Sequence, residues 1–222
     1  MTPRTSTAEP KLRRQVVAFG RRLFAQGLIV SSDGNLSARL GSKHVLITPA
    51  GVSKASLRPS DLVVVDLDGR PRGRGRRPSS EMAMHLEVYR RVPTARAVIH
   101  AHPPFATALT VAGLPFPDDV LPETAATLGD VPVTGLAMPG TSEDADVIRQ
   151  LIVDHRAILL RQHGSLTYGA SLDEACDHLE RVEHTARVFW LARTLGHVQR
   201  LPPDLMARLD DARHGSAPAG DA

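Results

Sequence analysis

The chain has a single cysteine, Cys176, among its 222 residues. One cysteine excludes an internal disulfide framework of the kind that stabilises small secreted proteins. No apolar run approaches the roughly 18 residues that a membrane-spanning helix needs. The N-terminus is polar and lacks the apolar core of a secretory signal. These absences favour a soluble protein of the cytoplasm with no membrane partner.

Aromatic residues are also scarce, at 4% of the chain, and this bears on nucleic-acid binding. Residues 70–77 form a dense basic run, but the run contains no aromatic residue on which a base could stack. The formal charge of the whole chain is only +3, because 27 basic residues are offset by 24 acidic ones. We therefore expect an exposed hairpin loop at 70–77 and no nucleic-acid partner.

The composition, with 42% hydrophobic residues, is sufficient for one well-buried domain. We predict a disordered lead over residues 1–9, a single domain over 10–200 and a flexible tail over 201–222. Apolar spacing and turn residues predict helices over 10–27, 78–91, 105–111, 142–155 and 171–196, and strands over 36–40, 45–48, 62–66, 97–102, 131–136 and 157–160.

Two histidines, His100 and His102, stand at the end of the apolar strand predicted over 97–102. Side chains two residues apart on a strand share a face, and two neutral imidazoles side by side are half of a zinc site. A third candidate, His163, follows the apolar strand at 157–160. Any one of these histidines alone fits a core or surface position equally well, and the spacing between His102 and His163 carries no information by itself.

An acidic residue, Glu81, lies in the first turn of the helix predicted over 78–91. The helix dipole favours its ionised carboxylate there. Such a carboxylate beside a cation can bind the cation or remove a proton from a substrate carbon. The alternative is that Glu81 only stabilises its own helix.

Three segments could receive a dianionic phosphate. Ser79 and Ser80 offer two hydroxyls at a helix start, where backbone N–H groups are free. Gly34 and Asn35 offer close backbone approach and an amide donor, and Gly51 lies in a second glycine turn. Each segment alone also fits an ordinary turn or cap.

The order of six motifs along the chain resembles the class II aldolase and adducin family, and within it the zinc aldolases of the L-fuculose-phosphate aldolase type. The motifs lie at residues 31–39, 47–52, 78–81 with His85, 98–102, 139–141 and 162–164. The resemblance extends over residues 10–196.

The resemblance implies a fold, an assembly and a site. The fold is an α/β class three-layer α/β/α sandwich around a mostly antiparallel sheet, and the assembly is a homotetramer with active sites at subunit interfaces. The cofactor is one zinc ion per subunit. The implied metal ligands are His100, His102 and His163, with Glu81 as a further ligand in the empty site and the acid/base group in turnover, and the implied phosphate cradle is Gly34, Asn35, Gly51, Ser79 and Ser80.

The implied reaction is reversible cleavage of a ketose 1-phosphate, such as fuculose 1-phosphate, to dihydroxyacetone phosphate and an aldehyde. Other zinc-enolate reactions stay open, namely 4-epimerisation, dehydration and decarboxylation. Glu81 stands where the epimerases typically have Asp, and Ser80 where the dehydratases typically have Ala, so both residues favour the aldolase. A non-catalytic assembly domain like the adducin head is a further alternative, against which the retained histidines and Glu81 argue.

One departure from the family pattern concerns the acid that protonates the aldehyde oxygen. In the fuculose-phosphate enzyme a tyrosine from a neighbouring subunit serves as this donor, and the resemblance aligns it with Leu136, which cannot transfer a proton. The only tyrosines are Tyr89 and Tyr168. In the phosphate cradle, Ala50 stands where a hydroxyl residue is frequent. The acid and the aldehyde are therefore not predicted.

Overall fold

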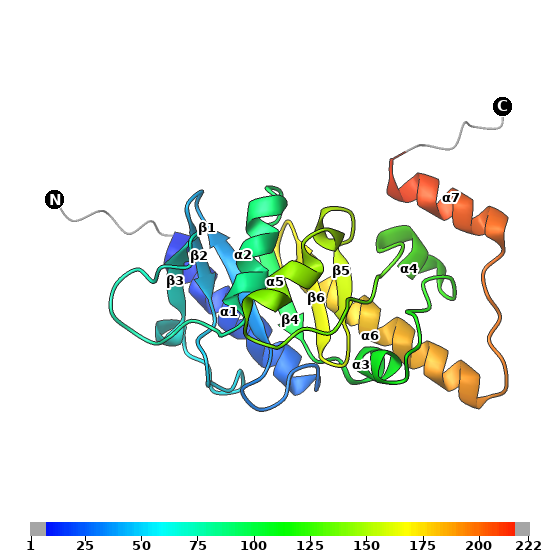
Figure 1. Ribbon diagram of the computed structural model, residues 1–222, viewed down its shortest axis with the longest axis horizontal. Coiled ribbons are helices and arrows are strands. Elements are labelled where there is room, and N and C mark those ends of the chain that lie inside the picture. Colours follow the sequence, from blue (N-terminus) through cyan, green and yellow to red (C-terminus); the bar gives the residue numbers. More distant parts are fainter. Residues whose placement is uncertain (1–7, 216–222) are drawn as a thin grey trace.

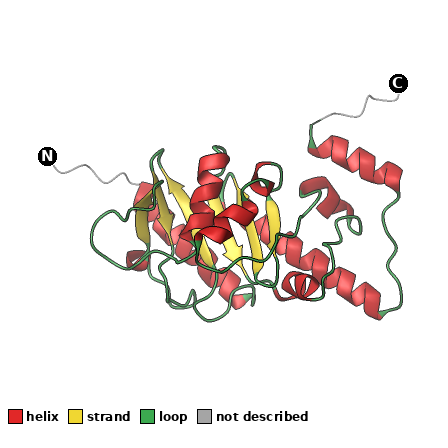
Figure 2. Cartoon of the chain, in the orientation of Figure 1, coloured by secondary structure: helices red, strands yellow, loops and turns green. Residues whose placement is uncertain are grey.

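A six-stranded sheet forms the centre of the computed structural model, which describes residues 8–215 (Figures 1 and 2). The strand order is β3-β2-β1-β4-β6-β5, and every neighbouring pair is antiparallel. The strands are β1 (Asn35–Leu40), β2 (His44–Ile47), β3 (Val63–Asp66), β4 (Ala97–Ala101), β5 (Ala157–Leu160) and β6 (Gly164–Gly169).

Helices cover both faces of this sheet. One apolar cluster joins strand residues to α1 (Ala8–Ala25) and α6 (Leu172–Thr194). A second cluster joins the other face to α2 (Met82–Arg91) and α5 (Ser142–Ile148). The predicted three-layer α/β/α sandwich around an antiparallel sheet is therefore confirmed. Within the described residues, none of the helices combines the length and the apolar character needed to cross a membrane.

The remaining α-helices lie beyond the β5 edge of the sheet (Figure 1). They are α3 (Pro104–Val111), α4 (Pro122–Thr127) and α7 (Pro203–Arg213), and two short 3-10 helices lie at Pro59–Asp61 and Leu151–Val153. α3 and α4 pack against α6, and α7 packs against α4. The basic run at 70–77 forms an exposed loop after β3, as expected.

Strand β4 pairs with β1 and β6 along its edges and is buried on both faces, because helices cover both sides of the sheet. Ala97, Ile99 and Ala101 belong to the cluster under α1 and α6, whereas Val98 belongs to the cluster under α2. This alternation follows from the two-residue period of a strand. It places His100 on the same face as Val98, toward α2.

Several elements differ from the sequence prediction. The helix α4 was not predicted, and α2 begins at Met82 rather than at residue 78. β6 was not predicted, although it is a central strand of the sheet. The strand predicted over 131–136 is wrong: residues 132–134 make only two backbone hydrogen bonds to Leu159 and an isolated bridge there. The helix predicted over 142–155 ends at Ile148, and a 3-10 turn follows it.

The two ends of the chain also bear on the predicted boundaries. α1 begins at Ala8, within the lead predicted over 1–9, and residues 1–7 lie outside the described part. The tail predicted as flexible over 201–222 contains α7, which begins with Pro203 and half-buries Leu205 and Leu209 at helical spacing. Residues 216–222 lie outside the described part.

An ion cluster around Glu87 ties α2 to the end of α5. Glu87 is only 7% exposed. Its Oε1 accepts hydrogen bonds from Arg91 at 3.0 Å and from Arg149 at 2.9 Å, and Arg90 lies 3.7 Å from its Oε2. Burial alone would raise the pKa of Glu87, but the hydrogen bonds from Arg149 and Arg91 outweigh it and hold the pKa below its ordinary value.

We predict that Glu87→Gln lowers the free energy of unfolding at pH 7 by about 1–2 kcal/mol, because hydrogen bonds to a charged group are lost while the arginines reach solvent. Since the folded-state pKa lies below the unfolded one, this contribution is present above the ordinary pKa of about 4.3 and lost as pH falls through the folded value. Urea denaturation at several pH values measures it, with exposed Glu123→Gln as control. A difference that stays constant with pH contradicts the prediction.

Candidate metal and phosphate site

His100 and His102 lie at the end of β4 and face each other across 3.0 Å, measured between their Nε2 atoms. His100 is fully buried. Its Nδ1 lies 2.9 Å from the carbonyl oxygen of Ser165 on β6. Since a carbonyl only accepts, Nδ1 carries the hydrogen and Nε2 presents its lone pair. This is how proteins usually orient a metal-binding histidine.

His163 reaches the same place from the turn between β5 and β6. The ligand nitrogens of the three histidines all lie within 4.8 Å of one another. Gly164 makes this approach possible, because a Cβ there would overlap the carbonyl oxygen of Ala101. Gln162 before it has a positive φ of 55°, which closes the turn tightly. The structure thus brings together three histidines whose sequence spacing was uninformative.

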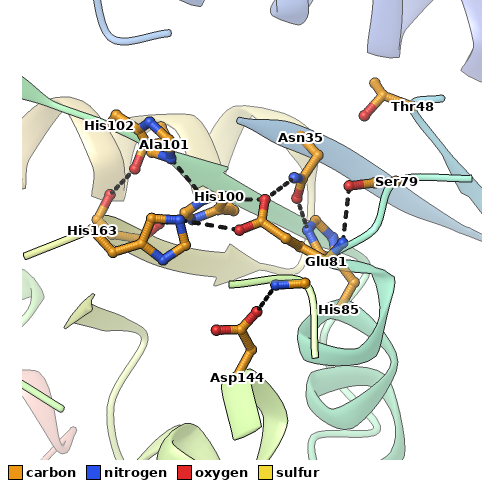
Figure 3. Close-up of polar contacts among 12 residues, drawn as sticks. Asn35, Thr48, Ser79, Glu81, His85, His100, Ala101, His102, Asp144 and His163 are labelled. Carbon is orange, nitrogen blue, oxygen red and sulfur yellow. Dashed lines mark hydrogen bonds and ion pairs between the residues drawn. The ribbon is translucent and has the colours of Figure 1, made fainter. Parts of the chain in front are cut away.

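Glu81 directs its carboxylate at these imidazoles (Figure 3). Oε1 lies 3.1 Å from His163 Nε2, and Oε2 lies 3.4 Å from His100 Nε2. Oε2 also accepts a hydrogen bond from Asn35 Nδ2 at 2.7 Å. The sequence placed Glu81 in the first turn of its helix, whereas the structure places it one residue earlier, at the N-cap of α2.

Burial and mutual contacts set the charges of this cluster. Burial lowers the pKa of His100 to about 3 and lowers that of His102 as well. The hydrogen bond with Glu81 raises the pKa of His163. Burial alone would raise the pKa of Glu81, but its hydrogen bond with His163 and the neighbouring histidines hold it well below the ordinary value. His100 and His102 are therefore neutral at pH 7, and Glu81 is ionised.

The donor set fits a divalent metal ion. Three imidazole nitrogens with an open fourth position are typical of catalytic zinc. Zinc–nitrogen bonds of about 2.0–2.1 Å in a tetrahedron place the nitrogens roughly 3.3 Å apart. The separation of 3.0 Å between His100 and His102 is close to that value. His100, His102 and His163 are thus able to hold such an ion, with the Glu81 carboxylate beside it.

The predicted phosphate residues come from three loops, two of which run side by side. Pro49 and Pro78 form an isolated bridge, and the Ser79 N–H donates to the Thr48 carbonyl at 3.1 Å. Ser79 is buried, and its Oγ accepts a hydrogen bond from the Glu81 N–H at 3.3 Å. Ser80 is exposed on the same loop.

The glycines in these loops have left-handed backbones, with φ of 62° at Gly34 and 69° at Gly51. At Gly34 a Cβ would also lie 2.9 Å from the carbonyl oxygen of His100, so only glycine lets this loop approach β4. Gly51 is exposed and has open space around it. The structure brings Asn35 and Ser79 into contact with Glu81, while the phosphate role of all five residues stays a prediction.

Lys54 is a cation beside the same loops, and its place there was not predicted from the sequence. Lys54 is only 1% exposed, and its Nζ donates to the carbonyls of Ser32 at 2.6 Å and Val52 at 3.4 Å. Burial lowers its pKa to about 8, against the attraction of Asp33 and Glu81. Its one signal in the sequence is its position three residues after Gly51, and lysines are ordinarily exposed.

The Pro139-Gly140-Thr141 motif has a structural contact with the predicted phosphate loop. The buried Asp144 carboxylate accepts the Gly140 N–H at 2.5 Å (Figure 3). A Cβ on Gly140 would lie 3.2 Å from the Cβ of Ser80. Asp144 therefore holds this segment against Ser80.

Neither tyrosine hydroxyl is free to act as an acid. Tyr89 OH lies 2.9 Å from Ser37 Oγ, and Tyr168 OH donates to the Ile152 carbonyl at 2.7 Å. Both side chains are buried, and burial raises the pKa of Tyr168 to about 12. Leu136, by contrast, is 64% exposed. Neither tyrosine therefore supplies the proton donor that the resemblance implies at position 136.

Comparison with known proteins agrees with the resemblance carried by the six motifs. A family model described as the class II aldolase and adducin N-terminal domain matches residues 14–190. The chain is 33% identical over 216 residues to the 5-methylthioribulose-1-phosphate/5-deoxyribulose-1-phosphate aldolase of Rhodospirillum rubrum, covering 94% of this chain and 97% of that protein.

Two further relatives differ from each other in their named activities. The chain is 34% identical over 187 residues to the 3-oxo-tetronate 4-phosphate decarboxylase of Escherichia coli K12, covering 82% of this chain and 88% of that one. The solved structure of an L-fuculose 1-phosphate aldolase matches with a TM-score of 0.84 and 31% identity, covering 93% of this chain and 96% of that chain.

We predict that His102→Ala abolishes metal retention, because only two of the three imidazoles remain. The fold should persist, because His102 is only half-buried. Bound zinc, measured by mass spectrometry after dialysis, should fall from about one ion per chain to near zero. Circular dichroism should be unchanged. His197→Ala, at an exposed histidine outside the cluster, is the matched control and should keep its metal. Full occupancy in His102→Ala would show that the cluster is not the metal site.

Proposed function

Because the chain belongs to the class II aldolase and adducin family, we propose that it is a zinc-dependent aldolase acting on a ketose 1-phosphate. The products are dihydroxyacetone phosphate and an aldehyde. The observation that carries the proposal is the Glu81 carboxylate, held 3.1 Å from His163 and 3.4 Å from His100. A base and three metal-binding imidazoles thus meet at one point, as enolate chemistry requires.

In this proposal His100, His102 and His163 hold the zinc ion, which when bound supplies a Lewis acid for the substrate carbonyl and hydroxyl oxygens. Glu81 removes or returns the proton at the carbon of dihydroxyacetone phosphate that bonds to the aldehyde. Asn35 fixes Oε2 of Glu81 by its hydrogen bond. The aldehyde oxygen takes its proton from water, since both tyrosine hydroxyls are buried and bonded elsewhere.

The phosphate end of the substrate is bound by Gly34, Asn35, Gly51, Ser79 and Ser80. Backbone N–H groups serve at Ala50, where a hydroxyl is absent. The ammonium of Lys54 lies beside these loops, where it donates to the Ser32 and Val52 carbonyls. Its positive charge favours the binding of a dianion there. Binding at this distant group fixes the reacting carbons against the metal.

The aldehyde end is apolar in this proposal. Ala137, Val147 and Leu160 line the hollow beside His163 together with the polar Thr134, Asp144 and Arg161. Next to Ala137, Leu136 and Met138 are 64% and 62% exposed. Such a rim suits an aldehyde that ends in a methyl or methylthio group. The name of the Rhodospirillum rubrum relative supports this choice, and we propose 5-deoxy- and 5-alkylthio-pentulose 1-phosphates as the substrates.

Decarboxylation is the second candidate, and the named activity of the Escherichia coli relative supports it. Loss of carbon dioxide from a 3-oxo-tetronate 4-phosphate yields dihydroxyacetone phosphate through the same carbanion. The two reactions differ only in the group that leaves this carbon, so one site can serve either.

We also propose a homotetramer with the active sites at subunit interfaces. Exposed apolar side chains on α6 and just after it support burial against a second copy, with Trp190 at 51% and Leu195 at 89% exposure. Light scattering of the purified chain measures the assembly, and a monomer at micromolar concentration would contradict it.

The deciding experiment incubates the zinc-loaded protein with dihydroxyacetone phosphate and with acetaldehyde, methylthioacetaldehyde or lactaldehyde. We expect a new carbon–carbon bond, formed faster with the first two aldehydes. A parallel reaction with 3-oxo-tetronate 4-phosphate measures carbon dioxide. Release of carbon dioxide without any aldol product would replace the aldolase by the decarboxylase.

We predict that Glu81→Gln keeps its zinc but exchanges the carbon-bound proton of dihydroxyacetone phosphate roughly 10²- to 10⁴-fold more slowly, because general base catalysis contributes a factor of this size. Deuterium incorporation followed by NMR measures the exchange. Glu123→Gln, at an exposed residue outside the site, is the control. Undiminished exchange in Glu81→Gln refutes the role of Glu81.

A further inference from the structure

A continuous line of buried polar side chains leads from α2 to Glu81. Tyr89 OH lies 2.9 Å from Ser37 Oγ, which lies 2.6 Å from His85 Nδ1. His85 Nε2 lies 2.5 Å from Asn35 Oδ1, and Asn35 Nδ2 lies 2.7 Å from Glu81 Oε2. The four residues that precede Glu81 in this line are at most 3% exposed. Figure 3 shows Asn35 between Glu81 and His85.

Two periodicities bring these side chains together. Asn35 and Ser37 are two residues apart on β1 and therefore share a face. Glu81, His85 and Tyr89 follow one another at intervals of four along α2, from its N-cap, and therefore share a helix face. The motif Asn-x-Ser on the strand meets Glu-x-x-x-His-x-x-x-Tyr on the helix.

The hydrogen positions along this line are fixed by elimination. An ionised carboxylate only accepts, so Asn35 directs its NH2 group at Glu81 and its carbonyl at His85. His85 Nε2 must then carry a hydrogen. Burial lowers the pKa of His85 to about 4, so the ring is neutral and Nδ1 accepts the Ser37 hydroxyl. Ser37 in turn accepts from Tyr89, so every hydrogen bond donates toward Glu81.

We propose that His85, Ser37 and Tyr89 are positioning residues for Glu81, which act by holding the Asn35 amide in one of its two orientations. The catalytic consequence rests on the proposed function, whereas the hydrogen-bond directions do not. None of the three touches the imidazole cluster in the described contacts.

The physical reason is that Asn35 has a second orientation of nearly the same shape. The flipped amide would set its carbonyl oxygen against Glu81 Oε2 and its NH2 group against the Nε2 hydrogen of His85. The contact with Glu81 is repulsive for either tautomer of His85, and the contact with His85 is repulsive as long as Nε2 carries its hydrogen. Ser37 keeps this tautomer by donating into Nδ1, and Tyr89 in turn donates to Ser37 Oγ. Loss of the line frees the amide, and Glu81 loses the donor that fixes Oε2.

The first test measures the tautomer of His85 directly. Nitrogen NMR on the zinc-loaded chain with labelled histidine, with the His85 signals identified by their loss in His85→Leu, should show hydrogen on Nε2 only. Ser37→Ala should add the Nδ1-protonated form. An Nδ1 hydrogen or a doubly protonated ring in the unsubstituted protein would overturn the proposal.

The second test compares variants by exchange of the carbon-bound proton of dihydroxyacetone phosphate at saturating concentration. His85→Leu should slow exchange roughly 10- to 100-fold, as is usual when such an orienting partner is lost, with zinc content unchanged. His85→Gln should restore most of the rate, because its amide N–H can donate to Asn35. Tyr89→Phe should slow exchange less than His85→Leu does.

Matched controls separate positioning from a general loss of stability. Tyr168→Phe removes another buried tyrosine hydroxyl, which bonds only to the Ile152 carbonyl. His178→Leu removes another buried imidazole, which contacts the Tyr168 carbonyl from α6. Both controls should keep the exchange rate. Equal losses in controls and test variants, or undiminished exchange in a folded His85→Leu protein, would overturn the proposal.

The two tests also distinguish this proposal from the proposed function. If the unsubstituted zinc protein exchanges no proton, the proposed function fails, and the tautomer alone decides the hydrogen-bond order. If it exchanges protons normally and His85→Leu does too, the positioning role fails while the aldolase proposal stands.

Discussion

The pairing of β4 with β6 is the interaction on which the site depends. Its register sets Ala101 opposite Ser165 and so places His163, just before β6, beside His102. The same register lets the Ser165 carbonyl accept from His100 Nδ1. A slip of one residue would turn His100 to the opposite face, among the aliphatic side chains under α1 and α6, where an unpartnered imidazole is costly. The register of the sheet and the meeting of the three imidazoles are therefore one constraint.

The second layer of the site is the meeting of α2 with β1. A carboxylate as buried as that of Glu81 persists only where donors surround it. Asn35 supplies one donor. Behind it, both ring nitrogens of His85 are hydrogen-bonded, Nε2 to Asn35 and Nδ1 to Ser37. The core beneath α2 is thus polar where it approaches the imidazoles and aliphatic elsewhere, around Val98 and Met84.

Local patterns predicted most of the elements, because β1 to β4, α1, α2 and α6 each carry their own period. They did not predict β6, because only four residues lie between Gly164 and Gly169. This short run stands between the turn at His163 and the Ser171 cap of α6, and so carries little pattern of its own. The His100–His102 pair was visible from strand spacing. His163 and the predicted phosphate loops were candidates from their residue types, and only the motif order joined them, because only the closed sheet brings them near one another. Lys54 was missed because burial of a lysine leaves no pattern in the sequence.

The strand order has a consequence for folding. β4 joins the meander of β1 to β3 on one side to the hairpin of β5 and β6 on the other. Asn35 and His163, 128 residues apart in the sequence, both reach Glu81 only after both halves have docked on this strand. Contacts of such long range form slowly and late. An ion held by all three imidazoles therefore requires the completed sheet, and by mass action it stabilises this assembled state.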